Sequence, residues 1–262
     1  MFLNKAKYLE YIRDPEQIIV MRKILDKIEK VLKNHEVVYS DFLDPYQRRL
    51  SYSILNRFSD LNYFEEGGLE EAERKSIIIY PFYLNKEDIE NPIGSIEITG
   101  NFRRRLSHRD YLGSILGLGI KREKIGDIYL HDDFAQIVLH RDILDFVKLH
   151  LNKVGNQNVY VEEISLDEIK QGVTEYIEKN ITVSSLRVDN VISTVYNISR
   201  SKCLMYFNQN RVKVNWEPIR QPFHLADETD LISVKGEGRF LIYKNLGKTK
   251  KGRHKLIIKI YV

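Results

Sequence analysis

The sequence predicts an α+β fold in three parts: an N-terminal helical region over residues 1–75, a central α/β sandwich over 76–166, and a smaller αβ module over 181–262. In the first part, apolar residues recur every three or four positions, which is typical of helices packed on one side. From Ser76 the pattern changes to short β-branched runs, and after Ser185 helical and strand-like segments follow each other. With six prolines and fourteen glycines in 262 residues, the chain has little sequence suited to long flexible linkers.

Two helices are expected in the N-terminal region. Asp14 and Asp44 each precede a proline, and each therefore resembles an N-cap followed by proline at the first helical position, where its missing N–H costs nothing. Gly67-Gly68 would end the helical pattern. The apolar stripes would consist of Ile18, Met21, Leu25, Ile28 and Leu32 in the first helix and of Leu50, Ile54, Phe58 and Leu61 in the second.

The central part is expected to form a sheet with two interleaved helices. Strands are predicted over 77–80, 93–99 and 159–164, and a hairpin over 127–140 that turns near Asp132-Asp133. A helix should begin at about Arg141 and bury Ile143, Leu144, Val147 and Leu151. This layout resembles that of RNA-recognition domains. Their paired aromatic signature is not evident here, so we do not expect bases to stack on this sheet.

The other central helix is predicted from Ser107, which resembles an N-cap with Asp110 completing an acidic capping box. Leu112, Ile115 and Leu116 would be its buried stripe, and Gly119 its C-terminal stop. Gly113 and Gly117 share one face and cost about 1 kcal/mol each relative to alanine. This cost indicates a close neighbour, either a packed strand or an RNA backbone.

No enzymatic motif is convincing. Ser107, His108 and Asp110 are too close in sequence for a catalytic relay on a helix, and capping explains them better. The glycines at 113, 117 and 119 match neither a dinucleotide fingerprint nor a P-loop. A hydrated turn explains His131, Asp132 and Asp133 better than a metal site does. A single cysteine, Cys203, excludes an internal disulfide and a cysteine-built zinc site.

The charge is unevenly distributed. Residues 181–262 carry 15 Lys and Arg against 6 Asp and Glu, a net charge of +9, whereas the other 180 residues carry 26 against 31, a net charge of −5. Such a basic module attracts polyanions. Its bases lie in glycine-punctuated, strand-like sequence rather than on an amphipathic helix, which favours nucleic acid over a membrane surface.

The C-terminal module should begin with two short helices, the first over 186–195 and the second capped by Ser199. Arg200 and Lys202 then lie in the first turn of the second helix, where cations oppose the helix dipole. An anion would explain them, because free N–H groups and two cationic side chains could bind one phosphate. Strands are expected at 212–215 and 231–234, followed by a tight basic bend at 236–240.

Residues 186–240 resemble the RNA-binding domain named after ribosomal protein S-four, through Arg187-x-Asp189, Ser199-Arg200-Ser201-Lys202, Val212-x-Val214-Asn215 and the step from Asp230 to Arg239. Val188 stands where a leucine is common. The resemblance implies that Arg187, Arg200, Lys202 and Arg239 face RNA, and that Asp189 fixes local geometry.

The chain as a whole resembles the bacterial YlmH family, through residues 41–45, the segment SHRDYLGSILGLGIKREKIGDI, residues 183–187 and residues 249–253. This resemblance implies a ribosome-associated RNA-binding protein without catalytic activity. Its relatives act on large subunits obstructed by peptidyl-tRNA, in quality control of the stalled chain, and the family has been linked to cell division through gene neighbourhood.

We therefore predict a factor that binds rRNA and tRNA on the large ribosomal subunit, with no catalytic residues, metal or cofactor. A cytoplasmic location is expected, since no apolar run could span a membrane and the N-terminus does not resemble a signal peptide. We also expect the protein to be a monomer. The alternatives are an RNA-modifying enzyme, such as a pseudouridine synthase, and an adaptor of the division machinery. The predicted RNA-binding residues are Arg187, Arg200, Ser201, Lys202, Lys213, Arg239, Lys250, Lys251 and Arg253 in the C-terminal module and Ser107, His108, Arg109, Lys121 and Arg122 in a second surface that also includes Arg103, Arg104, Arg105 and Lys124.

Overall fold

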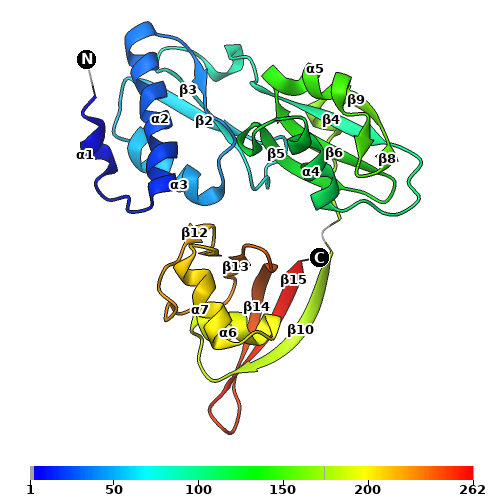
Figure 1. The fold of residues 1–262 in the computed structure, drawn as a ribbon. Coiled ribbons are helices and arrows are strands. Elements are labelled where there is room, and N and C mark those ends of the chain that lie inside the picture. The colour runs from blue at the N-terminus through cyan, green and yellow to red at the C-terminus, as the bar shows by residue number, and fades with distance from the viewer. Residues whose placement is uncertain (1–2, 174, 262) are drawn as a thin grey trace. The chain divides into compact units, whose positions relative to one another are not determined.

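The computed structural model describes residues 3–173 and 175–261 (Figure 1). Contacts within the chain divide it into two compact units, Met1–Val173 and Thr174–Val262. Both units combine helices with antiparallel sheets, which confirms the predicted α+β class.

The N-terminal part of the first unit packs three helices on a small sheet. Asp14 and Asp44 are N-caps as predicted: the Asp14 carboxylate accepts hydrogen bonds from two backbone N–H groups, and Asp44 forms a capping box with Gln47. The predicted stripe of the long helix buries Met21, Leu25 and Ile28 completely. The elements are α1 (Lys5–Leu9), α2 (Pro15–Asn34), α3 (Pro45–Leu55), β1 (Val38–Tyr39), β2 (Leu61–Glu66) and β3 (Ser76–Pro81), with sheet order β1-β3-β2.

The expectation of an entirely helical N-terminal region was wrong. Helix α3 ends at Leu55, and the predicted helical position Leu61 begins β2 instead. Strand β3, expected in the central sheet, pairs with β1 and β2. Every residue of β3 is buried, so the strand needs neighbours on both edges, and the aromatic run after Leu61 supplies one of them. The helix-like spacing of Phe58 and Leu61 arises from a turn followed by a strand.

The central part has the predicted order of elements, a strand and a helix followed by two strands, a helix and a strand. Helices α4 and α5 cover one face of the sheet around Ile96, Ile98 and Ile137, and the predicted hairpin turns between Leu130 and Phe134. The elements are β4 (Ile93–Thr99), α4 (His108–Gly117), β5 (Ile125–Leu130), β6 (Phe134–His140), α5 (Arg141–His150) and β9 (Tyr160–Ile164), in the sheet order β5-β6-β4-β9. A small hairpin, β7 (Lys153–Val154) and β8 (Gln157–Asn158), and three single 3-10 turns, Lys86–Asp88, Arg122–Lys124 and Leu166–Glu168, connect them.

The opposite face of the central sheet is covered by the chain itself. Phe42 and Ile169 pack there against Tyr129 and Val138. The buried Gln136 donates to the carbonyl of Glu168 at 3.2 Å and accepts from the backbone N–H of Lys170 at 2.8 Å. RNA-recognition domains stack bases on the corresponding face. Here that face belongs to the core of the first unit.

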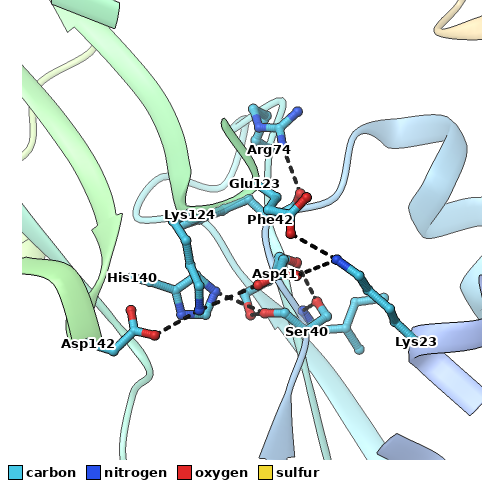
Figure 2. Close-up of polar contacts among 11 residues, drawn as sticks. Lys23, Ser40, Asp41, Phe42, Arg74, Glu123, Lys124, His140 and Asp142 are labelled. Carbon is cyan, nitrogen blue, oxygen red and sulfur yellow. Dashed lines mark hydrogen bonds and ion pairs between the residues drawn. The ribbon is translucent and has the colours of Figure 1, made fainter. Parts of the chain in front are cut away.

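One polar junction fastens the N-terminal and central parts together (Figure 2). The Asp41 carboxylate forms ion pairs with the ammonium groups of Lys23 at 3.3 Å and Lys124 at 3.5 Å. Lys124 forms a second ion pair with Asp142 at 2.7 Å. The Ser40 carbonyl accepts from the Nε2 atom of the buried His140 at 2.9 Å. These bonds connect helix α2 and the segment after β1 with the turn before β5, the end of β6 and the start of α5, so the two parts form one unit.

The second unit is a six-stranded antiparallel sheet with two helices on one face. The predicted helices and strands of this module are present, and β10 runs across residue 181, where the module was expected to begin. Val191, Cys203, Phe207, Phe240 and Ile258 lie in its core. The elements are β10 (Tyr176–Val183), α6 (Val188–Tyr196), α7 (Arg200–Asn208), β11 (Val212–Val214), β12 (Glu217–Pro218), β13 (Leu231–Val234), β14 (Gly238–Lys248) and β15 (His254–Tyr261), in the order β10-β15-β14-β13-β11-β12.

The junction makes the stability of the first unit sensitive to acid. Burial, aided by Lys124, holds the pKa of His140 below its ordinary value of 6.5, against the opposing effects of Asp142, the Ser40 carbonyl and Asp41. Its Nδ1 has no hydrogen-bond partner within the described chain, so a proton added there would be buried without an acceptor. The unfolded chain therefore takes up this proton first, and the contribution of His140 is complete above pH 6.5 and is lost as the pH falls.

We predict that the free energy of unfolding falls less steeply below pH 6.5 in His140→Gln than in the wild type, by up to about 1.4 kcal/mol per pH unit for one proton. Urea denaturation between pH 5 and 8 measures this slope. His150→Gln, on the exposed surface of α5, is the matched control. Equal slopes in the wild type and His140→Gln would show that this ring does not couple the junction to pH.

Candidate nucleic-acid interface

The first turn of α7 does not have the geometry predicted for a phosphate site. Ser199 caps the helix by accepting from the N–H of Lys202 at 3.2 Å, which uses one of the free donors. The Lys202 ammonium forms an ion pair with Glu237 at 2.9 Å, and this contact raises the pKa of Lys202. Arg200 and Ser201 are exposed, and Arg200 forms no ion pair within the described residues. The structure thus leaves Arg200 open to an anion and pairs Lys202 with a carboxylate.

Arg187, at the N-cap of α6, is held by a buried carboxylate. Its Nε and one terminal nitrogen donate to Asp189 at 3.1 and 2.8 Å, and this contact raises the pKa of Arg187. The Asp189 side chain is only 5% exposed, whereas that of Arg187 is 41% exposed. Asp189 therefore fixes the plane of the guanidinium, which stays partly exposed. A guanidinium fixed in this way is suited to bind phosphate.

The hairpin between β14 and β15 carries the densest positive charge. Lys250, Lys251 and Arg253 lie in its exposed turn, which Thr249 closes by pairing its N–H with the Arg253 carbonyl at 2.7 Å. Gly252 has a φ of 75°, a left-handed conformation that favours glycine. Figure 1 shows the orange hairpin extending past β13. From residue 238 to the C-terminus the sequence contains no Asp or Glu, so no carboxylate of its own strands neutralises this end.

Lys213 and Arg239 lie on the sheet face opposite the two helices. Their neighbours Val212 and Phe240 are buried in the helix-covered core, and side chains alternate between the faces of a strand. The Arg239 guanidinium lies 4.7 Å from the centre of the Tyr261 ring. The residues predicted in the C-terminal module are therefore not one cluster: they occupy the helix side, the hairpin end and the opposite sheet face.

In the first unit, Ser107 caps α4 as predicted, and it forms the expected capping box with Asp110. The same carboxylate receives two bonds from Arg104, both at 3.0 Å, which lower the pKa of Asp110. Arg103, His108, Arg109 and Lys121 are exposed nearby in the sequence. Asp110 therefore fixes the orientation of the Arg104 guanidinium, and the Arg104 side chain remains 55% exposed.

Two members of the predicted second surface are structural. Arg122 donates to the carbonyl oxygens of Ile125 and Gly126, and burial lowers its pKa to about 10. Lys124 belongs to the junction with Asp41 and Asp142. The turn at Arg122–Lys124 thus engages both cations with neighbouring backbone and carboxylates, so their contact with RNA stays a prediction that would require these bonds to be exchanged.

The expected close neighbour of the α4 glycines is also not a packed strand. A methyl group added at Gly113, Gly117 or Gly119 would meet no atom within 4 Å in the described chain. The buried residues of α4 are Tyr111 and Ile115, whereas Leu116, expected inside, is 37% exposed. This face of α4 is therefore open.

The sequence prediction missed several cations of the C-terminal sheet. Lys244, Lys248 and Lys255 are exposed on β14 and β15 and extend the positive hairpin. The signal that could have identified them is the complete lack of acidic residues after Glu237.

Neither a membrane span nor a metal site emerges from the described ranges. None of their helices is long and apolar enough to cross a bilayer. Within the same residues, no three His, Cys, Asp or Glu side chains are grouped so as to hold a metal ion.

Comparisons with known proteins match most of the chain. The family model "YlmH, N-terminal" matches residues 16–84, and "Putative RNA-binding domain in YlmH" matches 85–168. "Ribosome-associated protein quality control protein P2" of Bacillus subtilis (strain 168) is 32% identical over 225 residues, which cover 85% of this chain and 87% of that protein. The solved structure "Cell division protein ylmH from Streptococcus pneumoniae" is similar with a TM-score of 0.53 at 26% identity, covering 60% of this chain and 97% of that one.

The pairing of Lys202 with Glu237 leads to a prediction about affinity. We expect Glu237→Gln to tighten binding to structured RNA by about two- to fivefold, because it frees the Lys202 ammonium for a phosphate. The salt dependence should steepen by up to about 0.9 in log–log slope. Fluorescence anisotropy over a salt titration measures both quantities.

Glu228→Gln is the matched control, since it removes the same charge from the same module but releases no cation: Glu228 accepts from the backbone N–H of Asn245 at 2.9 Å. If both variants bind alike, net charge alone governs affinity. If Glu237→Gln binds more weakly than wild type, Lys202 does not contact RNA.

Proposed function

The chain belongs to the YlmH family, as its sequence predicted, and on that basis we propose that it is a non-catalytic RNA-binding factor of the ribosome. Its B. subtilis relative is named for ribosome-associated protein quality control. We assign this chain to the large ribosomal subunit, where it would bind rRNA and tRNA and assist the rescue of ribosomes stalled with peptidyl-tRNA. It would act in the cytoplasm as a monomer.

The observation that carries this proposal is the segregation of charge in the second unit. The turn between β14 and β15 carries three exposed cations, and neither of these two strands contains a carboxylate. This end of the sheet is therefore strongly positive. RNA offers a regular array of phosphates, and each contact with Lys or Arg releases condensed counterions. Residues 181–262 would act as an S-four-type RNA-binding domain, with Arg187 and Arg200 on its helix side.

The first unit supports a different role. Its central sheet face is filled by the chain's own Phe42 and Ile169, so this face cannot stack bases without unfolding part of the core. The exposed Arg103, Arg109 and Lys121 remain available for contacts with the RNA backbone. We therefore propose that the second unit provides most of the affinity and that the first adds backbone contacts or binds protein.

One alternative function is suggested by a relative of known structure. The S. pneumoniae relative of known structure is called a cell division protein. An adaptor for the division machinery would bind its partners through protein surfaces, so such complexes should survive nuclease treatment. An RNA-dependent factor should lose its partners when the RNA is digested.

We predict that Lys250→Ala combined with Lys251→Ala weakens binding to isolated large subunits and lowers the log–log salt slope by about 1.4–1.8, or 0.7–0.9 per lost phosphate contact. Cosedimentation over a range of KCl concentrations measures this. The control, Arg22→Ala combined with Lys30→Ala, removes two exposed cations from α2 in the first unit and should change the slope little. A flat salt response of the wild type would contradict the proposal.

We also predict that the protein leaves its RNA chemically unchanged. Ribosomal RNA incubated with the full chain and digested to nucleosides should show the same mass spectrum, and the same pseudouridine content after chemical labelling, as RNA incubated with buffer. A reproducible modification of the RNA that requires the protein would contradict the non-catalytic binding function and favour the alternative, an RNA-modifying enzyme.

A further inference from the structure

The sheet of the second unit has an uncovered face, opposite α6 and α7, that the sequence did not single out. Phe240, Ile242, Leu256 and Ile258 point into the helix-covered core. Because side chains alternate along a strand, their neighbours point the other way. The residues on this open face include Tyr176 on β10, Arg239 and Tyr243 on β14, and Lys255, Lys259 and Tyr261 on β15.

A β-bulge adds to this face. Ile242 pairs with Ile258, but Lys244 pairs with Ile257, so Tyr243 and Lys244 together oppose one residue. Two consecutive side chains then lie on the same side of the strand. The bulge therefore directs an aromatic ring and an ammonium group to the open face at one position.

The aromatic rings on this face are positioned by cations. The Lys259 ammonium lies 3.6 Å from the centre of the Tyr243 ring and 4.4 Å from that of Tyr176. Directly across from Lys259 on β10 is Glu178, yet the described chain contains no ion pair between the two. The Lys259 ammonium instead makes cation–π contacts with both tyrosine rings. Tyr243 and Tyr176 nevertheless remain 46% and 48% exposed.

The charge of the face favours nucleic acid over a protein strand or an apolar partner. Glu178 is the one carboxylate that strand alternation places on it within the described strands, among Lys213, Arg239, Lys244, Lys255 and Lys259. Exposed rings interleaved with cations are the pattern by which proteins bind unpaired strands: bases stack on the rings and phosphates meet the cations. Duplex RNA hides its base faces and could use only the cations.

We propose that this face is a second RNA site, which binds an unpaired strand by stacking bases on Tyr243 and Tyr176, with Lys259, Lys244 and Lys255 contacting the phosphates. The inference rests on the proposed function, which it extends from the helix side and hairpin of the module to its opposite face. The two sites would let one small domain hold a structured RNA and an adjoining single-stranded segment.

The test uses the full chain and two fluorescent probes, an oligouridylate of about ten nucleotides and a blunt RNA duplex of equal length. Tyr176→Ala combined with Tyr243→Ala should weaken binding of the oligouridylate at least about fivefold, since a stacked base typically contributes that much or more. Duplex binding should change less than twofold. The variant with Tyr176→Phe and Tyr243→Phe keeps both rings and should bind the oligouridylate like wild type.

Thermal unfolding checks that the alanine variant is folded. If the double variant unfolds, Tyr176→Ala alone, on the edge strand β10, takes its place in the same comparison. Unchanged oligouridylate binding by a folded alanine variant would overturn the second site, and so would equal losses for both probes. Retained duplex binding with an intact salt slope would in either case leave the proposed function standing. If the wild-type protein bound neither RNA probe, the proposed function itself would be contradicted.

Discussion

The constraint on which the second unit depends is that eight Lys and Arg residues follow Glu237 without a single carboxylate among them. Like charges on neighbouring strands repel, which disfavours the compact state. The fold lowers this cost by spreading the cations over a long hairpin and by placing Arg239 and Lys259 on tyrosine rings. A bound polyanion would remove the remaining repulsion. RNA binding and stability of this module are thus expected to be linked.

The first unit shows why a layout alone does not define a function. Its central sheet has the strand order of an RNA-recognition domain, but Phe42 and Ile169 occupy the face that would stack bases. The segment that contributes Phe42 also carries Asp41, which joins Lys23 to Lys124. One short segment therefore both covers the central sheet, through Phe42, and attaches the N-terminal part to it, through Asp41. The aromatic platform appears instead on the second unit, around Tyr243.

Local signals in the sequence identified most elements, because caps and alternation act over a few residues: the N-caps Asp14, Asp44, Ser107 and Ser199 are all present. Long-range pairing was not predictable in the same way. Nothing near Ser76 shows that β3 pairs with β2, and the bulge that turns Tyr243 outward depends on its register with β15. Residue type likewise could not distinguish Arg122, which is half-buried and donates to carbonyl groups, from Arg200, which is exposed.

The most direct test is ultraviolet crosslinking in cells, with mass spectrometry of the peptides that carry RNA and sequencing of the RNA attached to them. If the second unit binds RNA, crosslinked peptides should concentrate in residues 187–261, and the RNA should map to the large ribosomal subunit and tRNA. Crosslinks confined to the first unit, or none above background, would contradict the assignment of RNA binding to the basic C-terminal sheet.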